Sequence, residues 1–205
     1  DDAYQHRYVR PAINILLTQY HKPYHKDKVL PWGRLREWIK GARRADIVVV
    51  TKCPERLAYA HGQSLQIDLK LGEDQSFYAT SIDYGGYCIG PHQEIEIKDF
   101  AKLPFVLVTG IARPEPMVEK LKNLGARFEH FSYSDHHNFS EAEIIKLRQQ
   151  DLILTTEKDF QRLGDRLEKR AIYYWPIRTK FLFDRQQAFD LEILRRVAHH
   201  RSRQS

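Results

Sequence analysis

Four polar clusters in this 205-residue chain carry side chains that can move protons or hold a cation. They are Asp-Asp-Ala-Tyr-Gln-His at 1–6, Thr-Gly-Ile-Ala at 109–112, Ser-Asp-His-His at 134–137 and Thr-Thr-Glu-Lys-Asp at 155–159. Adjacent carboxylates such as Asp1 and Asp2 suit Mg²⁺, which takes oxygen ligands. A carboxylate beside a histidine suits proton abstraction, because each group orients the other and shifts its pKa. Attack of a hydroxyl or water on phosphorus requires both kinds of group.

Each cluster alone also has a purely structural interpretation. An Asp or Ser before a helix is commonly an N-cap, and a pair of histidines in a loop is commonly solvated. The interest of the four clusters lies in their common position near the ends of predicted strands. The carboxyl ends of parallel strands collect at one edge of a sheet, which would bring several carboxylates and imidazoles together there.

Short apolar runs and amphipathic stretches alternate along most of the chain. The runs predict strands at 14–18, 46–51, 105–109, 127–133, 152–155 and 171–175. The amphipathic stretches predict helices at 35–45, 115–124, from a capping box at 140–143, just after 155, and at 186–200. Strands separated by helices predict an α/β fold with parallel sheets covered on both faces.

The stretch from 52 to 101 has a different pattern. Apolar and polar residues alternate at 65–71 and again at 77–82, which predicts half-exposed, antiparallel strands. We therefore expect a β-rich connector at 56–103 between two α/β segments, one at 1–55 and a C-terminal α/β lobe at 104–185; the resemblance described below implies that 1–55 is the remainder of an N-terminal catalytic lobe. A C-terminal amphipathic helix is expected at 186–205, with Phe189, Ile193 and Val197 facing inward.

Composition narrows the class of protein. Hydrophobic residues make up 42% of the chain, a globular value, and no apolar stretch is long enough to span a bilayer. The two cysteines, Cys53 and Cys88, have no metal-ligand spacing, which favours a protein of a reducing compartment without disulfides. The chain opens on Asp1 without a methionine, and we expect it to be part of a longer protein.

Five segments together resemble a known family. They are D-D-A-Y-Q-H-R at 1–7, L-P-W-G-R-L-R-E at 30–37, V-T-G-I-A-R-P at 108–114, S-D-H-H-N-F-S at 134–140 and T-T-E-K-D-F at 155–160. In this order and spacing they resemble the C-terminal two thirds of tetraacyldisaccharide 4′-kinase, the lipid A kinase of Gram-negative bacteria. V-V-V-T-K-C-P at 48–54 is similar to Bacteroidetes-type members.

The resemblance implies a fold and a reaction. The fold would consist of P-loop-NTPase-like parallel-sheet lobes, a partial N-terminal lobe and a smaller α/β/α C-terminal lobe, joined by a β-stranded connector. The reaction would transfer the γ-phosphate of ATP, with Mg²⁺, to the 4′-hydroxyl of tetraacyldisaccharide 1-phosphate, a lipid A precursor. The enzyme would be peripheral on the cytoplasmic face of the inner membrane.

The resemblance also assigns residues. Asp1 would take the proton of the sugar hydroxyl, Asp2 would lie nearer the metal, and His136, with His137 close behind, would orient the base. The remaining assignments are substrate contacts by Gln5, His6, Arg36 and Glu37, and nucleotide contacts by Glu157, Lys158 and Asp159.

One part of the family pattern is missing from these residues. No G-x-x-x-x-G-K-[ST] loop occurs, so the chain has no strong cradle for the β- and γ-phosphates. We therefore expect this polypeptide alone to be inactive and the loop to lie upstream of Asp1.

The basic balance of the chain suggests an anionic partner. Its net charge is +6, and basic residues cluster at 21–28, 34–44 and 195–203. Tyr20, Tyr24, Trp32 and Trp38 interleave with the first two clusters, which is typical of a surface that lies against anionic lipid headgroups. The simpler alternative is a solvated basic surface.

Two rival functions differ in class from a kinase. A metal-dependent phosphoesterase could use the Asp-His-His triplet as metal ligands, but such enzymes need several further Asp clusters and here the Asp1–Asp2 pair is the only other one. A nucleic-acid-binding module would rest on charge alone, because no binding motif is present, so no nucleic-acid partner is expected.

Overall fold

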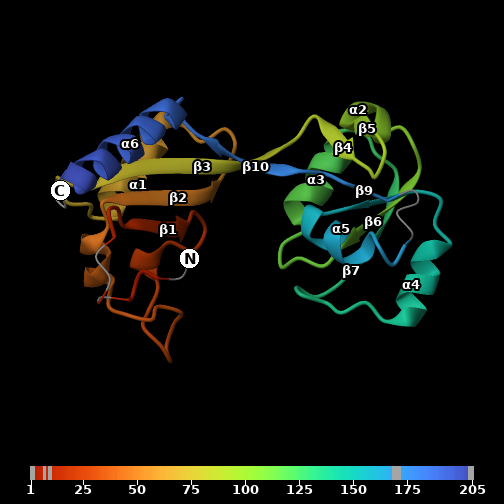
Figure 1. Ribbon diagram of the computed structural model, residues 1–205, viewed down its shortest axis with the longest axis horizontal. Coiled ribbons are helices and arrows are strands. Elements are labelled where there is room, and N and C mark those ends of the chain that lie inside the picture. The colour runs from red at the N-terminus through yellow and green to blue at the C-terminus, as the bar shows by residue number, and fades with distance from the viewer. Residues whose placement is uncertain (1–2, 7, 9–10, 168–171, 203–205) are drawn as a thin grey trace. The chain divides into compact units, whose positions relative to one another are not determined.

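The computed structural model describes residues 3–6, 8, 11–167 and 172–202. The chain divides into two compact units, and each is described by itself (Figure 1). Unit 1 consists of residues 1–83 and 179–205, and unit 2 of residues 84–178. The stretch 56–103 is therefore divided between the two units, and the C-terminal segment 186–205 belongs to unit 1.

Unit 1 is built on a four-stranded sheet in the order β1-β2-β3-β10. These strands are β1 (Ile15–Gln19), β2 (Ile47–Cys53), β3 (Ser76–Tyr84) and β10 (Ile177–Phe181). β1 and β3 both pair with β2 in parallel. The β-branched run of β2 is buried from Ile47 to Val50, as expected of a strand covered on both faces.

Three predictions for unit 1 are wrong in detail. The alternating stretch 65–71 lies largely in the helix α1 (Tyr59–Asp68). The strand β3 has a buried centre and is parallel to β2, whereas a half-exposed, antiparallel strand was expected. The predicted helix at 35–45 shortens to the 3₁₀ helix η2 (Ile39–Arg44). It begins late because the N–H of Leu35 bonds back to the carbonyl of Lys28, which keeps Leu35 in a turn. A further 3₁₀ turn, η1 (Tyr24–Lys26), follows β1.

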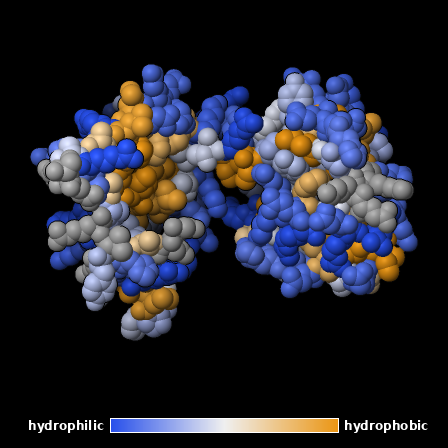
Figure 2. All heavy atoms as spheres, viewed as in Figure 1, coloured by the Kyte–Doolittle hydropathy of each residue, from blue (hydrophilic) through white to orange (hydrophobic). Residues whose placement is uncertain are grey.

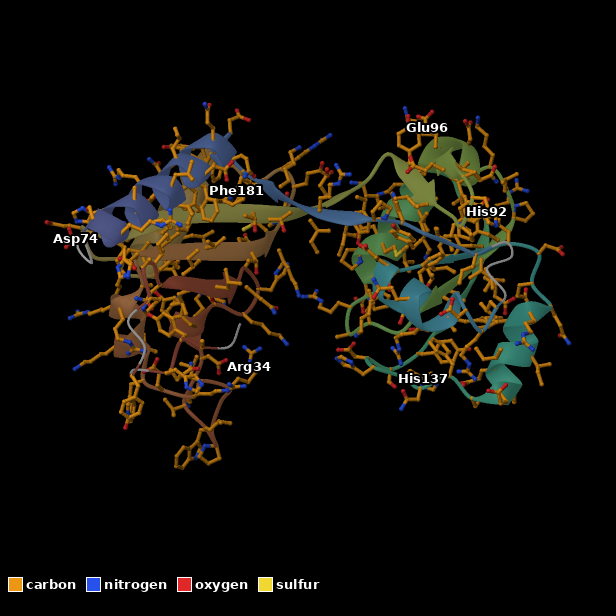
Figure 3. All side chains as sticks on the ribbon, in the orientation of Figure 1. Arg34, Asp74, His92, Glu96, His137 and Phe181 are labelled. Atoms are coloured by element: carbon orange, nitrogen blue, oxygen red, sulfur yellow. The ribbon has the colours of Figure 1, made fainter. Side chains whose placement is uncertain are left out.

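The C-terminal helix α6 (Gln186–Ser202) packs on one face of this sheet. Phe189 and Ile193 contact Ile47, Val49 and Tyr78, which confirms their predicted inward position. Phe181 lies beneath the same helix (Figure 3), with its ring centroid 4.6 Å from that of Phe189.

A polar network also holds α6 to the sheet. The Glu192 carboxylate accepts hydrogen bonds from the hydroxyls of Ser76 (2.7 Å) and Tyr78 (2.8 Å) and from Nε of Arg196 (2.9 Å). Arg196 in turn pairs with Asp46 at 3.0 Å. Burial raises the pKa of Glu192, but these hydrogen bonds outweigh it and hold the pKa below its usual range.

Replacing Glu192 by Ala is expected to lower the free energy of unfolding by about 2 kcal/mol, because two hydroxyls and a guanidinium lose their shared acceptor. Urea denaturation followed by far-UV circular dichroism measures the change. Asp190→Ala on the exposed side of α6 is the matched control and is expected to change stability by less than about 0.5 kcal/mol. Equal effects of the two substitutions would show that the polar network around Glu192 does not stabilise the packing of α6 on the sheet.

Unit 2 contains a six-stranded sheet in the order β5-β4-β9-β8-β6-β7. Its strands are β4 (Tyr87–Ile89), β5 (Glu94–Glu96), β6 (Phe105–Thr109), β7 (Phe128–Ser132), β8 (Ile153–Thr155) and β9 (Ile172–Tyr174). β7, β6, β8 and β9 are parallel, which confirms the predicted α/β pattern. The helices are α2 (Ile97–Phe100), α3 (Glu115–Asn123), α4 (Glu141–Arg148) and α5 (Glu157–Leu163).

Helices cover both faces of this sheet. The strand β6 is therefore buried throughout, and its side chains alternate between two cores. Leu107 packs with Met117 and Leu121 of α3 in one core. Val108 packs with Ile144 of α4 and Leu163 of α5 in the other. The loops after the parallel strands are thereby fixed at the strand ends, where the predicted site residues lie.

Among the described residues, no helix combines the length and the apolar character needed to cross a bilayer.

Candidate functional site

The first candidate cluster lies in unit 1 and joins two of the sequence motifs. The hydroxyl of Tyr4 donates to the carbonyl of Gly41 at 2.9 Å, and Nη2 of Arg44 donates to the carbonyl of Tyr4 at 3.2 Å. The Arg44 guanidinium also lies over the Tyr4 ring, 4.9 Å from its centroid. It binds both carboxylate oxygens of Glu37, at 2.6 and 3.1 Å. The motifs at 1–7 and 30–37 are thus held together by Arg44.

The predicted substrate residues around this cluster differ in their exposure to solvent. Gln5, His6 and Arg36 are exposed, whereas Glu37 is partly buried and binds Arg44. The hydrogen bond from Arg44 to Glu37 raises the pKa of Arg44 further above its already high value. Sequence reasoning missed Arg44; its only signal was its position seven residues after Glu37, at the end of a basic stretch. Asp1 and Asp2 lie outside the described residues.

The basic and aromatic segment that follows β1 forms an exposed loop. Asp27 accepts hydrogen bonds from the backbone N–H of Lys28 and from the backbone and side chain of Arg34, which closes the loop. Arg34 is labelled in Figure 3. Trp32 and Trp38 are 80% and 78% exposed. Tyr24, which was predicted to belong to the same surface, is buried, and its hydroxyl donates to the carbonyl of Leu69.

The second candidate cluster lies at the carboxyl ends of β6 and β8 in unit 2. Asp159 is fully buried, and its Oδ2 accepts from the N–H of Gly110 (2.8 Å) and from the hydroxyl of Thr156 (2.8 Å). The same hydroxyl accepts from the N–H of Asp159 and so caps α5. Asp159, predicted at the nucleotide, therefore links the loops that follow two neighbouring strands.

The position of this link in the sheet is informative. The chain runs from β6 to β7 on one side and then to β8 on the other side of β6, so the strand order reverses between β6 and β8. Open α/β sheets commonly bind ligands at such a point. A Cβ on Gly110 would lie 2.9 Å from Oδ1 of Asp159, so the carboxylate already fills the space next to the turn.

The Ser-Asp-His-His loop between β7 and α4 holds its two histidines differently. His137 is labelled in Figure 3. Its Nε2 lies 3.1 Å from each carboxylate oxygen of Glu143, and its ring stacks on Tyr133 with a centroid distance of 4.7 Å. Glu143 also completes the predicted capping box with Ser140. Hydrogen bonds from the backbone and hydroxyl of Ser140 and from His137 lower the pKa of Glu143 to about 2.

His136 is the accessible histidine of the pair. Its side chain is 81% exposed, and its backbone lies in the left-handed region at φ 60°. Such a conformation is uncommon outside glycine and persists where the surrounding structure enforces it. The neighbouring Asp135 is held by Lys158, whose Nζ donates to Oδ1 at 2.7 Å. This hydrogen bond lowers the pKa of Asp135.

The structure thus brings together the motifs at 134–137 and 155–159 through the Lys158–Asp135 ion pair, while Glu157 remains exposed. One neighbour that the sequence did not indicate is His130, whose Nε2 lies 2.8 Å from the hydroxyl of Thr109. Burial, together with Lys122, lowers the pKa of His130. The pairing of Asp1 with His136 stays a prediction.

Metal ligands were predicted only at Asp2. Within the described part of the chain, no group of three or more His, Cys, Asp or Glu side chains is arranged to hold a metal ion.

Comparison with solved structures first identifies the class of fold. A crystal structure of LpxK from Aquifex aeolicus in complex with ATP matches 95% of this chain with a TM-score of 0.63. The sequences are 23% identical, and the match covers 56% of that chain. The protein therefore has the two-sheet α/β fold of this class, as predicted.

The family follows from sequence. The model of the tetraacyldisaccharide-1-P 4′-kinase family matches residues 1–198, and the chain belongs to this family. A tetraacyldisaccharide 4′-kinase of Flavobacterium johnsoniae is 42% identical over 203 residues, and one of Phocaeicola vulgatus is 39% identical over 209. These matches cover 96% and 94% of this chain but only 58% and 57% of the relatives. A kinase family gives no support to the phosphoesterase alternative.

Proposed function

We propose that this chain is the part of a lipid A 4′-kinase that carries the acid–base and acceptor-binding residues. The reaction is transfer of the γ-phosphate of ATP to the 4′-hydroxyl of tetraacyldisaccharide 1-phosphate. The observation that supports this function best is the contrast within the histidine pair: His137 is tied to Glu143, whereas His136 is presented to solvent on a left-handed backbone.

In this proposal Asp1 accepts the proton of the attacking hydroxyl and His136 holds that carboxylate in position. A carboxylate and an imidazole that share a hydrogen bond keep the base oriented and ionised until the proton moves. His137 acts indirectly, because its bonds to Glu143 fix the start of α4 and hence the loop that carries His136. The Lys158–Asp135 ion pair restrains the other side of that loop.

The sugar acceptor is assigned to the cluster in unit 1. Gln5, His6 and Arg36 expose hydrogen-bonding groups suited to hydroxyls and to the anionic 1-phosphate. Glu37 is held by Arg44 in a fixed orientation, so it would accept from a sugar hydroxyl without reorganising.

The nucleotide needs residues beyond these 205. Glu157 and Lys158 could contact it, and Asp2 could share a Mg²⁺ ion, but no Gly-rich Lys-Ser/Thr loop is present to cradle a triphosphate. This chain's residues alone therefore do not fit ATP, and we assign the phosphate cradle to the N-terminal portion that the longer relatives possess.

A chimera tests the function. The N-terminal portion of the Flavobacterium johnsoniae kinase that the match does not cover is fused to this chain, and phosphorylation of tetraacyldisaccharide 1-phosphate is measured with ATP. Turnover by the chimera, and none by the 205 residues alone, is the expected result. A folded chimera without turnover, or turnover by the chain alone, would contradict the proposal.

We further propose that the loop carrying Trp32 and Trp38 rests on the anionic cytoplasmic face of the inner membrane. The two exposed indoles are accompanied by exposed Lys28, Arg34 and Lys40, and each cation near an anionic surface contributes about 1 kcal/mol.

Flotation with phosphatidylglycerol vesicles is expected to recover at least about tenfold more protein than flotation with phosphatidylcholine vesicles. The double substitution of Trp32 and Trp38 by Ser should abolish the difference. Tyr87→Ser, at an aromatic that is 53% exposed in unit 2, is the matched control and should preserve it. Equal recovery on both kinds of vesicle would argue for a solvated basic surface.

A further inference from the structure

A pocket in unit 1 lies apart from the residues assigned to the acceptor, the nucleotide and the base. Its walls are the helix α1, the strand β3 and the turn that follows β10, and its lining includes Tyr59, Gln63, Gln66, Phe77, Phe183 and Arg185. β3 and β10 lie at the edge of the sheet opposite β1. The chemistry of this pocket is therefore separate from that of the two clusters described above.

The side of α1 that lines the pocket is polar. Tyr59, Gln63 and Gln66 follow one another at intervals of four and three residues, so they lie on one side of the helix. Within the described part of the chain, the side-chain amides of Gln63 and Gln66 have no hydrogen-bond partner. Each amide offers two N–H donors and a carbonyl acceptor. The pocket thus holds hydrogen-bonding groups that the fold itself does not use.

The turn after β10 has a costly backbone conformation. Phe183 and Asp184 are consecutive residues in the left-handed region, at φ 59° and 53°. Such residues persist where the surroundings enforce them, and they cluster at ligand-binding sites. Here the Phe183 ring packs against Gly62, at which a Cβ would lie 2.8 Å from the ring. The turn and Gly62 together fix Phe183 as one wall of the pocket.

Aromatic rings form the apolar part of the pocket. Tyr59 is 64% exposed, and its ring stands edge-to-face with that of Phe183 at a centroid distance of 5.3 Å. Phe77 of β3 is partly buried on the opposite wall. Hydrophobic residues reach the surface of unit 1 between hydrophilic ones (Figure 2). Rings in these arrangements attract a further flat ring in an edge-to-face or offset geometry.

The same turn brings one cation to the pocket. The Arg185 guanidinium lies over the Tyr78 ring, 5.0 Å from its centroid. Among the described residues, no carboxylate is paired with Arg185. A guanidinium presents its N–H donors in a fork that matches a carboxylate. Arg185 is the only cation among the described lining residues, so the pocket suits an anion with one negative charge better than a phosphate with two.

We propose that this pocket binds a small aromatic monocarboxylate. The carboxylate would pair with Arg185 and accept from the amides of Gln63 and Gln66, and the flat ring would lie among the aromatic walls. The inference concerns unit 1 alone and does not depend on phosphoryl transfer, so its test measures binding and not activity.

Benzoate is the probe for this class of ligand. The ¹⁵N-labelled chain is titrated with benzoate, and the NMR signals of its side-chain amides are followed. The Gln63 and Gln66 signals are expected to shift saturably, with a Kd of about 1 mM or lower. Methyl benzoate, which has the ring without the charge, and inorganic phosphate, which has charge without the ring, should each bind at least about tenfold more weakly.

Two substitutions test the two halves of the pocket. Arg185→Gln should raise the Kd of benzoate at least about tenfold, because the charge-assisted pair is lost. Gly62→Ala should also raise it, because the new Cβ displaces the Phe183 ring. Arg195→Gln, at an exposed position of α6, is the matched control for the loss of one positive charge and should bind benzoate like the wild type.

The dispersion of the backbone amide signals identifies any variant that fails to fold. Gln63→Ala combined with Gln66→Ala, at exposed helical positions, then replaces that variant and should likewise weaken binding. Absence of a saturable shift in the wild type would overturn the proposal, as would unchanged affinity of the folded pocket variants. Binding of methyl benzoate or phosphate as tight as that of benzoate would overturn it equally.

Discussion

Replacing Asp159 by Ala is expected to destabilise unit 2 by about 3 kcal/mol. The carboxylate is fully buried and is the acceptor for both the Gly110 N–H and the Thr156 hydroxyl. Alanine leaves these donors without their partner in a site that excludes water, and each such loss costs about 1–3 kcal/mol. Asp159→Asn should cost less, because its amide oxygen can still accept from one donor.

Tryptophan fluorescence can follow the chemical unfolding of unit 2 separately from that of unit 1. The chain has three tryptophans, and Trp175 lies in unit 2, where it is 2% exposed. In a background where Trp32 and Trp38 are replaced by Phe, Trp175 reports the unfolding of unit 2 alone. Asp151→Ala, at an exposed position just before β8, is the control and should have little effect. An Asp159→Ala variant as stable as this control would show that the link is not structural.

Replacing His136 by Ala in the chimeric kinase is expected to lower kcat by about 100-fold or more, with little change in stability. The side chain is exposed and makes few contacts, so its loss removes acid–base support without disturbing packing. His137→Ala should affect stability more and kcat less than His136→Ala does. It loses the bonds to Glu143 and the stacking on Tyr133, so it should lower stability by about 1 kcal/mol and kcat by a smaller factor.

Comparing kcat with the denaturation midpoint separates the two roles. The pH profile of kcat provides a second readout, because removal of an acid–base group changes its shape whereas removal of a structural group does not. If both histidine variants lose the same activity, or if His136→Ala keeps the wild-type rate, the assignment of His136 beside the base is wrong.

The strands of this protein could be predicted from sequence where burial on both faces makes them uniformly apolar. β2 and β6 are such strands, and their predicted limits agree with the structure to within two residues. The stretch 65–71 was misleading because Ile67, which completes the alternating pattern, is 75% exposed on α1. The buried side of α1 is instead marked by Gly62 and by Leu69 at its C-terminal end, which are seven residues apart and therefore lie on the same side of the helix.

The candidate site was predictable in its parts but not in its internal bonds. The motifs at 134–137 and 155–159 were expected to meet at one sheet edge, and the ion pair between Lys158 and Asp135 joins them. The sequence contains no sign that Asp159 turns inward to Gly110, because the same Thr-x-x-Asp pattern is compatible with a solvent-facing cap. Only the packing of two loops distinguishes the two orientations.

The ends of unit 2 adjoin one another: the N–H of Gly85 donates to the carbonyl of Pro176 at 2.9 Å, and the indole N–H of Trp175 donates to the carbonyl of Gly85 at 2.6 Å. A domain whose first and last residues lie close together can be inserted into another domain, or removed from it, without forcing apart the chain ends of that other domain, which is why domain insertions are tolerated. Residues 84–178 should therefore be separable as an autonomous folding module, and unit 1 should close over the excision with a short turn between β3 and β10. This architecture would let evolution exchange the module that carries His136 and His137 while leaving unit 1 intact.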